Sequence, residues 1–580
     1  MHFSVWAPKR KSVSLKLQDA THPMQGPDDR GWWNIDLDTG SAEVDYTFLL
    51  DDEQGPYPDP RSPYQPNGVH AASRTYNHTR FQWTDQNFRA APLSAAIIYE
   101  LHIGTFTPEG TFDAAIAHLD HLVSLGVTHV EFMPVAAFEG DHGWGYDGVA
   151  LFAPHQPYGG PDGLKRLIDA CHARGLAVVL DVVYNHFGPS GNYTGLYGQY
   201  LNHRHSTPWG GAVNFEAAGS DQVRRFFIDN ALMWLRDYHV DGLRLDAVHE
   251  FVDRSAIHFL EQLSTEVEDL SATIGKQLVS IAESDLNDPR IVTPREANGY
   301  GIDAQWSDDF HHALHAVLTG EGSGYYEDFG SLDQLAKALT DVFVYNGIYS
   351  GHRSRIHGRP IGNLSYHHFL GYSQTHDQVG NRAQGDRLCH LVSFHRAQIA
   401  AALVLTSAFV PMLFQGEEWA ASSPFQYFAD HQDEELRHNV TRGRMEEFSA
   451  FGWKPEDVPD PESIETFQRS KLKWNEISKP PHKEMLDWYH KLIALRRSTP
   501  ALNHADAGSV EVKIDNAAKT MQICRDAIQT CVNFGQNGSK FLLPDAAEIL
   551  LSNGSSICSG NVLQLPPETV AVLRLSGRRP

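Results

Sequence analysis

Cysteine is scarce in this 580-residue chain, and the five present, at positions 171, 389, 524, 531 and 558, are scattered and without CxxC spacing. That pattern supports neither a disulfide framework nor a zinc site, so reduced thiols are expected. The N-terminus has no basic segment followed by an apolar run, which argues against a secretory signal. The best candidate for a membrane span, 399–414, is too short and contains Pro411. We therefore predict a cytoplasmic location and no membrane partner.

Positive charge is also in deficit. The chain has 47 Lys and Arg against 72 Asp and Glu, a formal net charge of -25, which argues against nucleic acid as a partner. Histidine is plentiful, at 32 residues, but the HEXXH motif is absent. His311, His312 and His315 are predicted to be polar positions on an ordinary helix, so we predict no metal and no cofactor.

The chain is too long for one hydrophobic core, and its patterning changes twice. Residues 1–90 alternate short apolar runs with turn residues, which predicts a small β-sandwich of the kind that binds carbohydrate. Its Trp6, Trp32 and Trp33 could form a sugar platform, although core packing is the favoured interpretation. Residues 91–500 form the predicted catalytic region, and 501–580 return to short strands, which predicts a C-terminal all-β domain.

Strands alternate with helices in the middle region, which indicates parallel βα units. About eight strands are predicted, the number that closes a (β/α)8 TIM barrel, so the fold class is α/β. The predicted strands are 97–102, 127–134, 176–183, 242–248, 278–283, 301–306, 371–376 and 410–415, and the predicted helices include 112–125, 161–174, 223–238, 253–270 and 387–405.

Two charges lie inside one apolar stretch, Val240–His249. Arg244 and Asp246 are two residues apart, so in a strand they point to the same face. A structural ion pair is the usual explanation of an Arg-x-Asp pattern. Here the pair would lie at the C-terminal end of a barrel strand, where such enzymes place their reacting groups, and the guanidinium would keep the carboxylate ionised. We therefore predict that the pair is functional.

Polar residues gather at the ends of several predicted strands, which favours one catalytic site on one face of the barrel. They are Asp181, Asn185 and His186 at the end of the third strand, Arg244, Asp246 and His249 at the fourth, Glu283 at the end of the fifth, and His376 and Asp377 at the end of the seventh.

Three carboxylates without metal-ligand spacing or a phosphate loop suit glycosidic bond chemistry. One carboxylate must be ionised to attack an oxocarbenium-like centre, and one carboxyl must be protonated to release the leaving oxygen. Asp246 beside Arg244 has the environment for the ionised role. Glu283 follows an apolar run with no neighbouring cation in sequence, and burial would raise its pKa toward that of a general acid.

These residues carry a family resemblance. The segments Asp181–His186, Gly242–Asp246, the Glu283 strand and His376-Asp377 resemble, in order and spacing, the four short regions of the α-amylase clan of glycoside hydrolases over roughly residues 95–480. The resemblance implies a retaining enzyme acting on α-glucans. It further implies Asp246 as nucleophile, Glu283 as acid/base and Asp377 as the carboxylate that holds sugar hydroxyls. By the same resemblance, the subsite of the attacked sugar is lined by Tyr146, Asp147, His186, Arg244 and His376.

Within the clan, several longer motifs are similar to those of enzymes that release trehalose from maltooligosyltrehalose, among them 142–148, 152–163, 185–193, 207–210, 281–290 and 375–382. Candidate contacts for the leaving pair are Trp209, Asp285, Asn287 and Gln378, each of which could equally stabilise a loop. His249 is a further candidate contact.

Three other functions stay open at this point. A branching enzyme is disfavoured, because such enzymes typically carry other residues at the positions of Asp147 and Gln378. A general α-amylase also stays open, because it would differ from a trehalose-releasing enzyme only in the sugar recognised on the leaving-group side of the cleft. A catalytically silent glucan-binding protein is the alternative from another class, because fold does not fix function.

Overall fold

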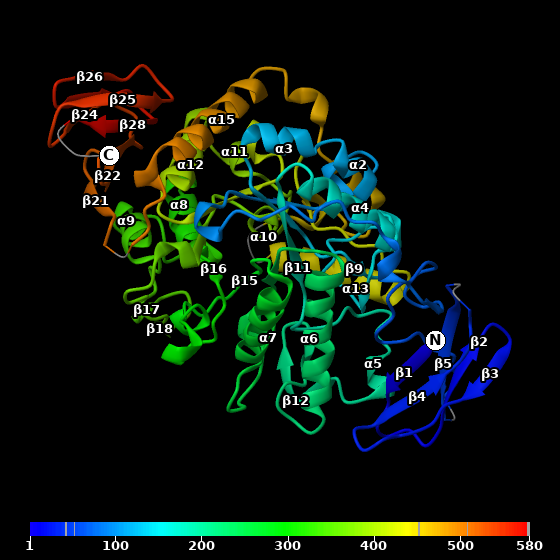
Figure 1. Cartoon of the computed structure of the whole chain (residues 1–580). Coiled ribbons are helices and arrows are strands. Elements are labelled where there is room, and N and C mark those ends of the chain that lie inside the picture. Colours follow the sequence, from blue (N-terminus) through cyan, green and yellow to red (C-terminus); the bar gives the residue numbers. More distant parts are fainter. Residues whose placement is uncertain (41–42, 52, 450–452, 507, 577–580) are drawn as a thin grey trace.

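The computed structural model describes residues 1–40, 43–51, 53–449, 453–506 and 508–576. Eight parallel strands form a closed barrel at its centre (Figure 1). In order around the barrel they are β11 (Ala177–Val182), β14 (Gly242–Leu245), β15 (Val279–Ala282), β16 (Ala304–Trp306), β19 (Phe369–Gly371), β20 (Val410–Phe414), β7 (Ile98–Leu101) and β8 (His129–Phe132). The predicted fold class is confirmed.

Residues of these strands are buried on both sides, which explains why they read as continuous apolar runs. A cluster that includes Ile98, Val179, Ile281, Leu370 and Met412 packs the strands together. The principal helices around the barrel are α4 (Gly160–His172), α6 (Ser220–Asp237), α7 (Phe259–Ile274), α8 (Asp308–Thr319), α12 (Phe394–Thr406) and α15 (His482–Ser498).

Two predicted strands were misplaced at their ends. The seventh was expected at 371–376, but β19 ends at Gly371, because Thr375 caps the short helix α10 (His376–Gly380) through its hydroxyl. The stretch read as a strand through Val248 ends at Leu245, because Ala247 adopts a left-handed φ of 41° that turns the chain.

Three helix predictions need correction. The segment 112–125 is two helices, α2 (Phe112–Ile116) and α3 (Leu119–Leu125), and 387–405 is α11 (Leu388–Leu391) followed by α12. The helix expected from Asp253 begins only at Phe259, because the Asp253 carboxylate instead binds Arg224 and the backbone N–H groups of Ser255 and Phe259.

The histidines of α8 lie on a helix, as predicted. His311 and His315 are buried at 0% and 4% exposure, and their rings bind Tyr326 and Glu321, so they are internal hydrogen-bonding groups.

The N-terminal region forms two antiparallel sheets, as expected of a sandwich. One pairs β1 (His2–Trp6) with β4 (Trp32–Asp36), and the other has the order β3 (Ala20–Pro23), β2 (Val13–Leu17), β5 (Asp45–Leu50), β6 (Ser73–Arg74). Phe3 of β1 and Tyr46 of β5 meet edge to face between them, with ring centroids 5.1 Å apart. Trp6 and Trp33 are buried, so they belong to the core.

Specific contacts fasten this region to the barrel. The Trp32 indole N–H donates to Gln222 of α6 at 2.9 Å, Trp6 packs against Tyr200, and Arg61 pairs with Asp229 of α6 at 2.8 Å. Wherever the domain boundary lies, the two parts are packed directly against each other.

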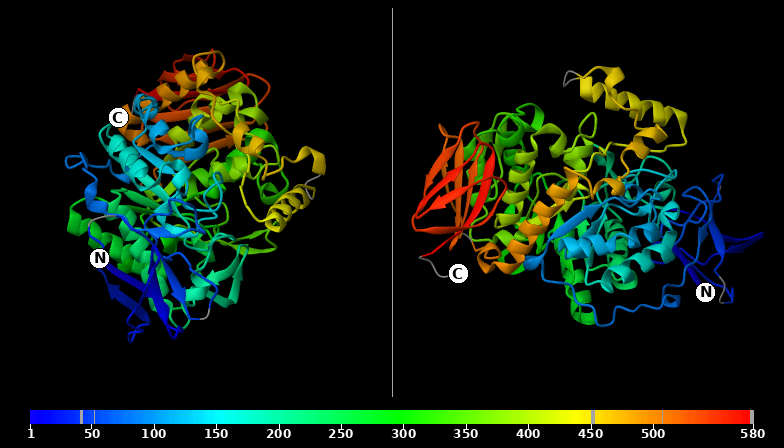
Figure 2. Two further views of the ribbon diagram at one scale, coloured as in Figure 1. Left: turned by 90° about the vertical axis from the view of Figure 1, so that its right-hand side faces the viewer. Right: turned by 90° about the horizontal axis from the view of Figure 1, so that it is seen from above.

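The C-terminal region lies on the opposite side of the barrel (Figure 2). It has a five-stranded sheet, β21 (Glu511–Asp515), β22 (Thr520–Arg525), β23 (Ile528–Asn533), β28 (Thr569–Leu575) and β25 (Ala547–Ser552). A three-stranded sheet of β24 (Ser539–Leu542), β27 (Val562–Leu565) and β26 (Ile557–Ser559) lies beside it. Arg525 is the main connection, donating to the carbonyls of Thr406, Ser407 and Leu502.

Within the described ranges, no helix is both long and apolar enough to cross a lipid bilayer.

A buried ionic cluster fastens the segment between the N-terminal sheets and β7. Asp85 accepts from His172 at 2.9 Å, His239 at 2.7 Å and Lys276 at 3.2 Å, and His172 also binds Asp241 at 2.9 Å. Burial alone would raise the pKa of Asp85, but these donors hold it well below its usual range. The cluster therefore joins the crossing segment to the starts of two barrel strands.

Removing that charge should destabilise the fold. Asp85→Asn leaves His172 and Lys276 without their shared anion, and we expect a loss of about 3 kcal/mol in the free energy of unfolding. Urea unfolding of the purified variant measures it. Asp120→Asn is the matched control, since Asp120 pairs with Arg174 at an exposed site and should cost at most about 1 kcal/mol. Equal effects of the two variants would show that the Asp85 cluster is not stabilising.

Candidate active site

Asp246 and Glu283 come together because the chain turns immediately after β14. The left-handed Ala247 places its N–H 2.8 Å from Glu283 Oε2, so the end of β14 is tied to the end of β15. Asn185, from the segment after β11, donates to Asp246 Oδ2 at 2.6 Å. Three strand ends thus converge on one pair of carboxyl groups.

Arg244 lies at the centre of this convergence and is wholly buried. Its Nη1 donates to both oxygens of Asp181, at 2.9 and 2.8 Å, and to Asp246 Oδ1 at 2.7 Å. Its Nη2 lies 2.9 Å from Glu283 Oε2, a charge contact without hydrogen-bond geometry. The ring of Trp306 lies under the guanidinium, 4.3 Å from its carbon. The predicted pairing of Arg244 with Asp246 is confirmed, and two further carboxyls share the same cation.

Asp246 and Glu283, which both lie next to Arg244, have opposite pKa shifts. Burial alone would raise the pKa of Asp246, but the charge of Arg244, with His186 and the Asn185 hydrogen bond, lowers it. For Glu283, burial and the negative charges of Asp246 and Asp377 outweigh Arg244 and raise the pKa well above its usual range. The direction expected for Glu283 is therefore found, and the surroundings favour the ionised form of Asp246 and the protonated form of Glu283.

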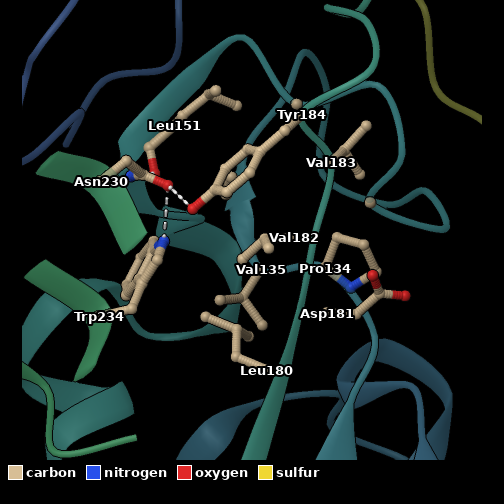
Figure 3. A pocket seen from close by; sticks show the side chains of 13 residues that line it. Pro134, Val135, Leu151, Leu180, Asp181, Val182, Val183, Tyr184, Asn230 and Trp234 are labelled. Carbon is tan, nitrogen blue, oxygen red and sulfur yellow. Dashed lines mark hydrogen bonds between the residues drawn. The ribbon is translucent and has the colours of Figure 1, made fainter. Parts of the chain in front are cut away.

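Asp181 supplies the second anion for Arg244. Figure 3 shows that Asp181 points to one side of β11, while Leu180 and Val182 point to the other, toward Trp234. On that outer side Asn230 of α6 accepts from the Tyr184 hydroxyl at 2.7 Å and from the Trp234 indole at 3.1 Å. Burial raises the pKa of Asp181 to about 6, against the charge of Arg244.

Glu100, on β7, accepts two hydrogen bonds from His376. Glu100 accepts from the His376 backbone N–H at 3.0 Å and from the ring Nδ1. On the other side of the ring, Nε2 lies 2.8 Å from the Tyr146 hydroxyl, which itself donates to Asp181 at 2.7 Å. Because that hydroxyl proton is committed to Asp181, Nε2 must carry a proton of its own. Burial lowers the pKa of His376, but the charge of Glu100 outweighs it and raises the pKa to about 9.

Asp377 is the most open of the three predicted catalytic carboxylates. Its side chain is 33% exposed, and Oδ1 lies 3.5 Å from His376 Nε2 and 3.3 Å from Asn381 Nδ2. It is the second residue of α10, and its charge helps to raise the pKa of Glu283.

The remaining predicted contacts of the attacked sugar surround this group. The Tyr146 ring stacks on His376, with centroids 5.1 Å apart, and His186 Nε2 donates to the Tyr146 carbonyl at 3.1 Å. Asp147 lies 3.8 Å from His431 Nε2. Trp209, predicted as a contact of the leaving pair, lies beside them on the turn between β12 (Leu201–Thr207) and β13 (Gly210–Val213). It is half exposed and stacks over His186 with centroids 4.9 Å apart.

The side chains predicted to contact the leaving group differ in the hydrogen bonds that they already make within the protein. Asp285 pairs with Arg353 Nη1 at 2.8 Å, and its backbone N–H lies 3.4 Å from His249 Nδ1. Gln378 completes the cap of α10, with Oε1 2.9 Å from the Thr375 N–H. Asn287 is buried and bonded to Asp309, so its role is structural.

Sequence reasoning missed Glu100 and His431. Glu100 is a charge inside the apolar run 97–101, which is the same signal that singled out Arg244, so it could have been found. His431 is held by Glu462, 31 residues further along the chain, at 2.8 Å, and nothing in the local sequence predicts that contact.

Comparison with known proteins agrees with this architecture. The family model "Alpha amylase, catalytic domain" matches residues 74–202. A malto-oligosyltrehalose trehalohydrolase from a Rhizobium species is 48% identical over 99% of this chain and 97% of its own length, and one from Saccharolobus solfataricus is 46% identical over 85% of each. A solved structure titled as a putative alpha amylase from Salmonella typhimurium superposes with a TM-score of 0.91 at 37% identity, covering 99% of this chain and 97% of its own.

An eight-stranded parallel barrel with two carboxyl groups of opposite pKa shift at its carboxyl rim, in a chain that matches the α-amylase model, defines a glycoside hydrolase of the α-amylase family. Full-length similarity then gives the narrower assignment. The chain belongs to the malto-oligosyltrehalose trehalohydrolase family. A 1,4-alpha-glucan branching enzyme from Vibrio parahaemolyticus is more distant, at 32% identity over 54% of this chain.

The Glu100–His376 pair generates a prediction about pH. Glu100→Gln removes the charge that raises the His376 pKa, so the imidazole should lose its proton about 1–3 pH units lower. A charged His376 holds Asp377 in place, so the alkaline fall in kcat should move to lower pH by a similar amount. The pH profile of kcat measures this shift.

Glu131→Gln is the matched control. Glu131 lies beside Glu100 across β7 and β8 and is equally buried, but burial and the charge of Glu100 raise its pKa well above the usual range, which favours its neutral form. Its amide variant should keep the wild-type profile. An unchanged alkaline limb in Glu100→Gln would contradict the role given to Glu100.

Proposed function

We propose that this chain hydrolyses the α-1,4 glucosidic bond next to the terminal trehalose unit of maltooligosyltrehalose, releasing trehalose and a maltooligosaccharide. The observation that carries the catalytic part is the sharing of Arg244 by Asp246 and Glu283, whose pKa values shift in opposite directions. A double displacement requires one carboxyl of each kind.

In this mechanism the Asp246 carboxylate attacks the anomeric carbon while Glu283 gives its proton to the leaving glycosidic oxygen. The product of this step is a covalent glycosyl ester on Asp246. Glu283, now ionised, takes a proton from water, which attacks the same carbon and releases the sugar with its α configuration retained. Arg244 keeps Asp246 ionised before attack and stabilises Glu283 after it has lost its proton.

The other site residues hold the sugar. Asp377, backed by the charged His376, is suited to accept hydrogen bonds from ring hydroxyls, and its exposure leaves it free to do so. Tyr146 offers a ring face beside the reacting centre, and Asp147 and His186 line the same subsite.

Specificity for a trehalose end depends on the part of the site that binds the leaving group. A non-reducing α,α-linked glucose pair has no free anomeric hydroxyl and is bent relative to maltose. Trp209 offers a half-exposed ring beside His186, and Asp285, His249 and Gln378 are the candidate polar contacts. A site with partners for such a pair rejects a plain maltosyl end, because those partners would remain unpaired. Similarity to named trehalohydrolases over the full chain supports this choice.

Replacing either central carboxyl tests the catalytic roles. Asp246→Asn and Glu283→Gln should each lower kcat by roughly a thousandfold or more while the protein still folds, because each removes one group needed for double displacement. Single-turnover and steady-state rates measure the loss, and far-UV circular dichroism checks folding. Glu261→Gln, on the outer helix α7, should keep full activity. Normal turnover in either central variant would exclude the assignment.

Offering two matched substrates tests the specificity. The purified protein should release trehalose from maltooligosyltrehalose and cleave the matching maltooligosaccharide at least about a hundredfold more slowly, because the polar partners of the trehalose unit stay unpaired. Chromatography of the products gives both rates. Equal rates would indicate a general α-amylase, new α-1,6 branches a branching enzyme, and binding without any cleavage a silent glucan-binding protein.

A further inference from the structure

A hollow of about 460 Å³ lies where the N-terminal region meets the barrel. One wall is the segment 65–70, which precedes β6. The others are 137–141 after β9 (Ala136–Ala137), 155–157 after β10 (Ala150–Pro154), and Asp430 with Gln432 beyond β20. The volume is in the range of small-molecule sites. None of the residues assigned above to catalysis or to sugar binding lines this space.

Direct bonds hold the walls in place. Glu139 Oε1 accepts from His70 Nε2 and from the Ser190 hydroxyl, both at 2.8 Å, and Oε2 accepts from the Gln432 backbone N–H at 2.9 Å. Asp430 Oδ2 accepts from the Asp141 N–H at 2.8 Å. Four separate stretches of chain therefore meet at Glu139, and the hollow is largely formed before any ligand arrives.

The lining selects the class of ligand. It has the carboxylates of Glu139, Asp141 and Asp430 and no lysine or arginine, so an anionic ligand does not fit. Across the described residues, no group of three or more His, Cys, Asp or Glu side chains is arranged to hold a metal ion. The amides of Gln65, Asn67, Gln156 and Gln432 add donors as well as acceptors. A neutral ligand rich in hydroxyl groups satisfies such a surface.

The position of the hollow relative to the catalytic carboxyls indicates which part of a bound glucan would reach the hollow. In the barrel order, β15 with Glu283 lies opposite β7, and the neighbours of β7 are β8 and β20. Asp147 follows β8 and His431 follows β20. Because Glu283 protonates the leaving oxygen, the leaving group lies toward β15. The part of the chain that stays on Asp246 therefore runs toward Asp147 and His431.

A smaller cavity adjoins the hollow on that side. It is lined by Asp147 and His431, and it shares Phe138, Glu139 and Asp430 with the hollow. The two spaces thus share part of their walls, and the smaller one includes Asp147, a predicted contact of the attacked sugar.

We propose that the hollow is a distal subsite for the α-glucan, where segment 65–70 of the N-terminal region binds glucosyl units several positions from the cleaved bond on the side retained by Asp246. This inference rests on the proposed cleavage of α-glucans. It gives the N-terminal region a part in binding substrate and predicts that longer chains bind more tightly.

Filling the hollow tests the proposal. Asn67 and Gln432 are exposed lining residues from two different segments, so Asn67→Trp and Gln432→Trp each place a ring in the space without removing a wall contact made by either side chain. Lys540→Trp, exposed on β24, is the control. All three are made in the Glu283→Gln background, and binding of maltotriose and maltoheptaose is measured by calorimetry.

We expect the Glu283→Gln parent and the Lys540→Trp control to bind maltoheptaose more tightly than maltotriose. Each filling variant should weaken maltoheptaose by about tenfold and maltotriose by less than about twofold, because only the longer chain reaches the hollow. The proposal is overturned if the parent binds both sugars equally, or if both filling variants keep the parent's affinity for maltoheptaose. Plain maltooligosaccharides contain no trehalose, so failure of the trehalose specificity would leave this result intact.

Discussion

The burial of one guanidinium among three carboxyl groups is the constraint on which the site depends. Arg244 is wholly enclosed, and a lone buried cation at that place would be very costly. Asp181, Asp246 and Glu283 from three adjacent strands surround it, so the cation holds three strand ends in one geometry. One cation faces three carboxyl groups, so the charges are not balanced within the cluster. Burial and the neighbouring negative charges raise the pKa of Glu283, which favours its protonated form.

A second charge pair repeats this arrangement across the barrel. Glu100 on β7 holds His376 charged, and His376 faces Asp377 and Tyr146 at the opening. Arg244 lies near β15, on the side of the rim assigned to the leaving group. His376 lies near β7, on the opposite side of the barrel. The N-terminal sheets are fastened next to the second side, through His70 on Glu139. The positions of the accessory regions are therefore connected to the direction in which a glucan would lie.

Much of the fold and site could be predicted because each feature has a local cause. Buried parallel strands are continuous apolar runs, and charges at the ends of such runs are costly unless they are used, which singled out Asp246, Glu283 and Asp377. The errors also have local causes. Thr375 stops β19 early by capping a helix, and Asp253 binds Arg224 instead of starting α7.

The sequence by itself determined the barrel, its eight strands and the residues at its carboxyl rim, because these follow from periodicity and from the cost of burying charge. Only the tertiary structure decided which groups share a charge. Glu283 has no cation near it in sequence, yet it lies 2.9 Å from Arg244, and Glu100 meets His376 across 276 residues. The hollow at Glu139 likewise needs chain segments near positions 70, 139, 190 and 432. Coulomb energies and desolvation depend on distance in space, which the order of residues along a chain does not specify.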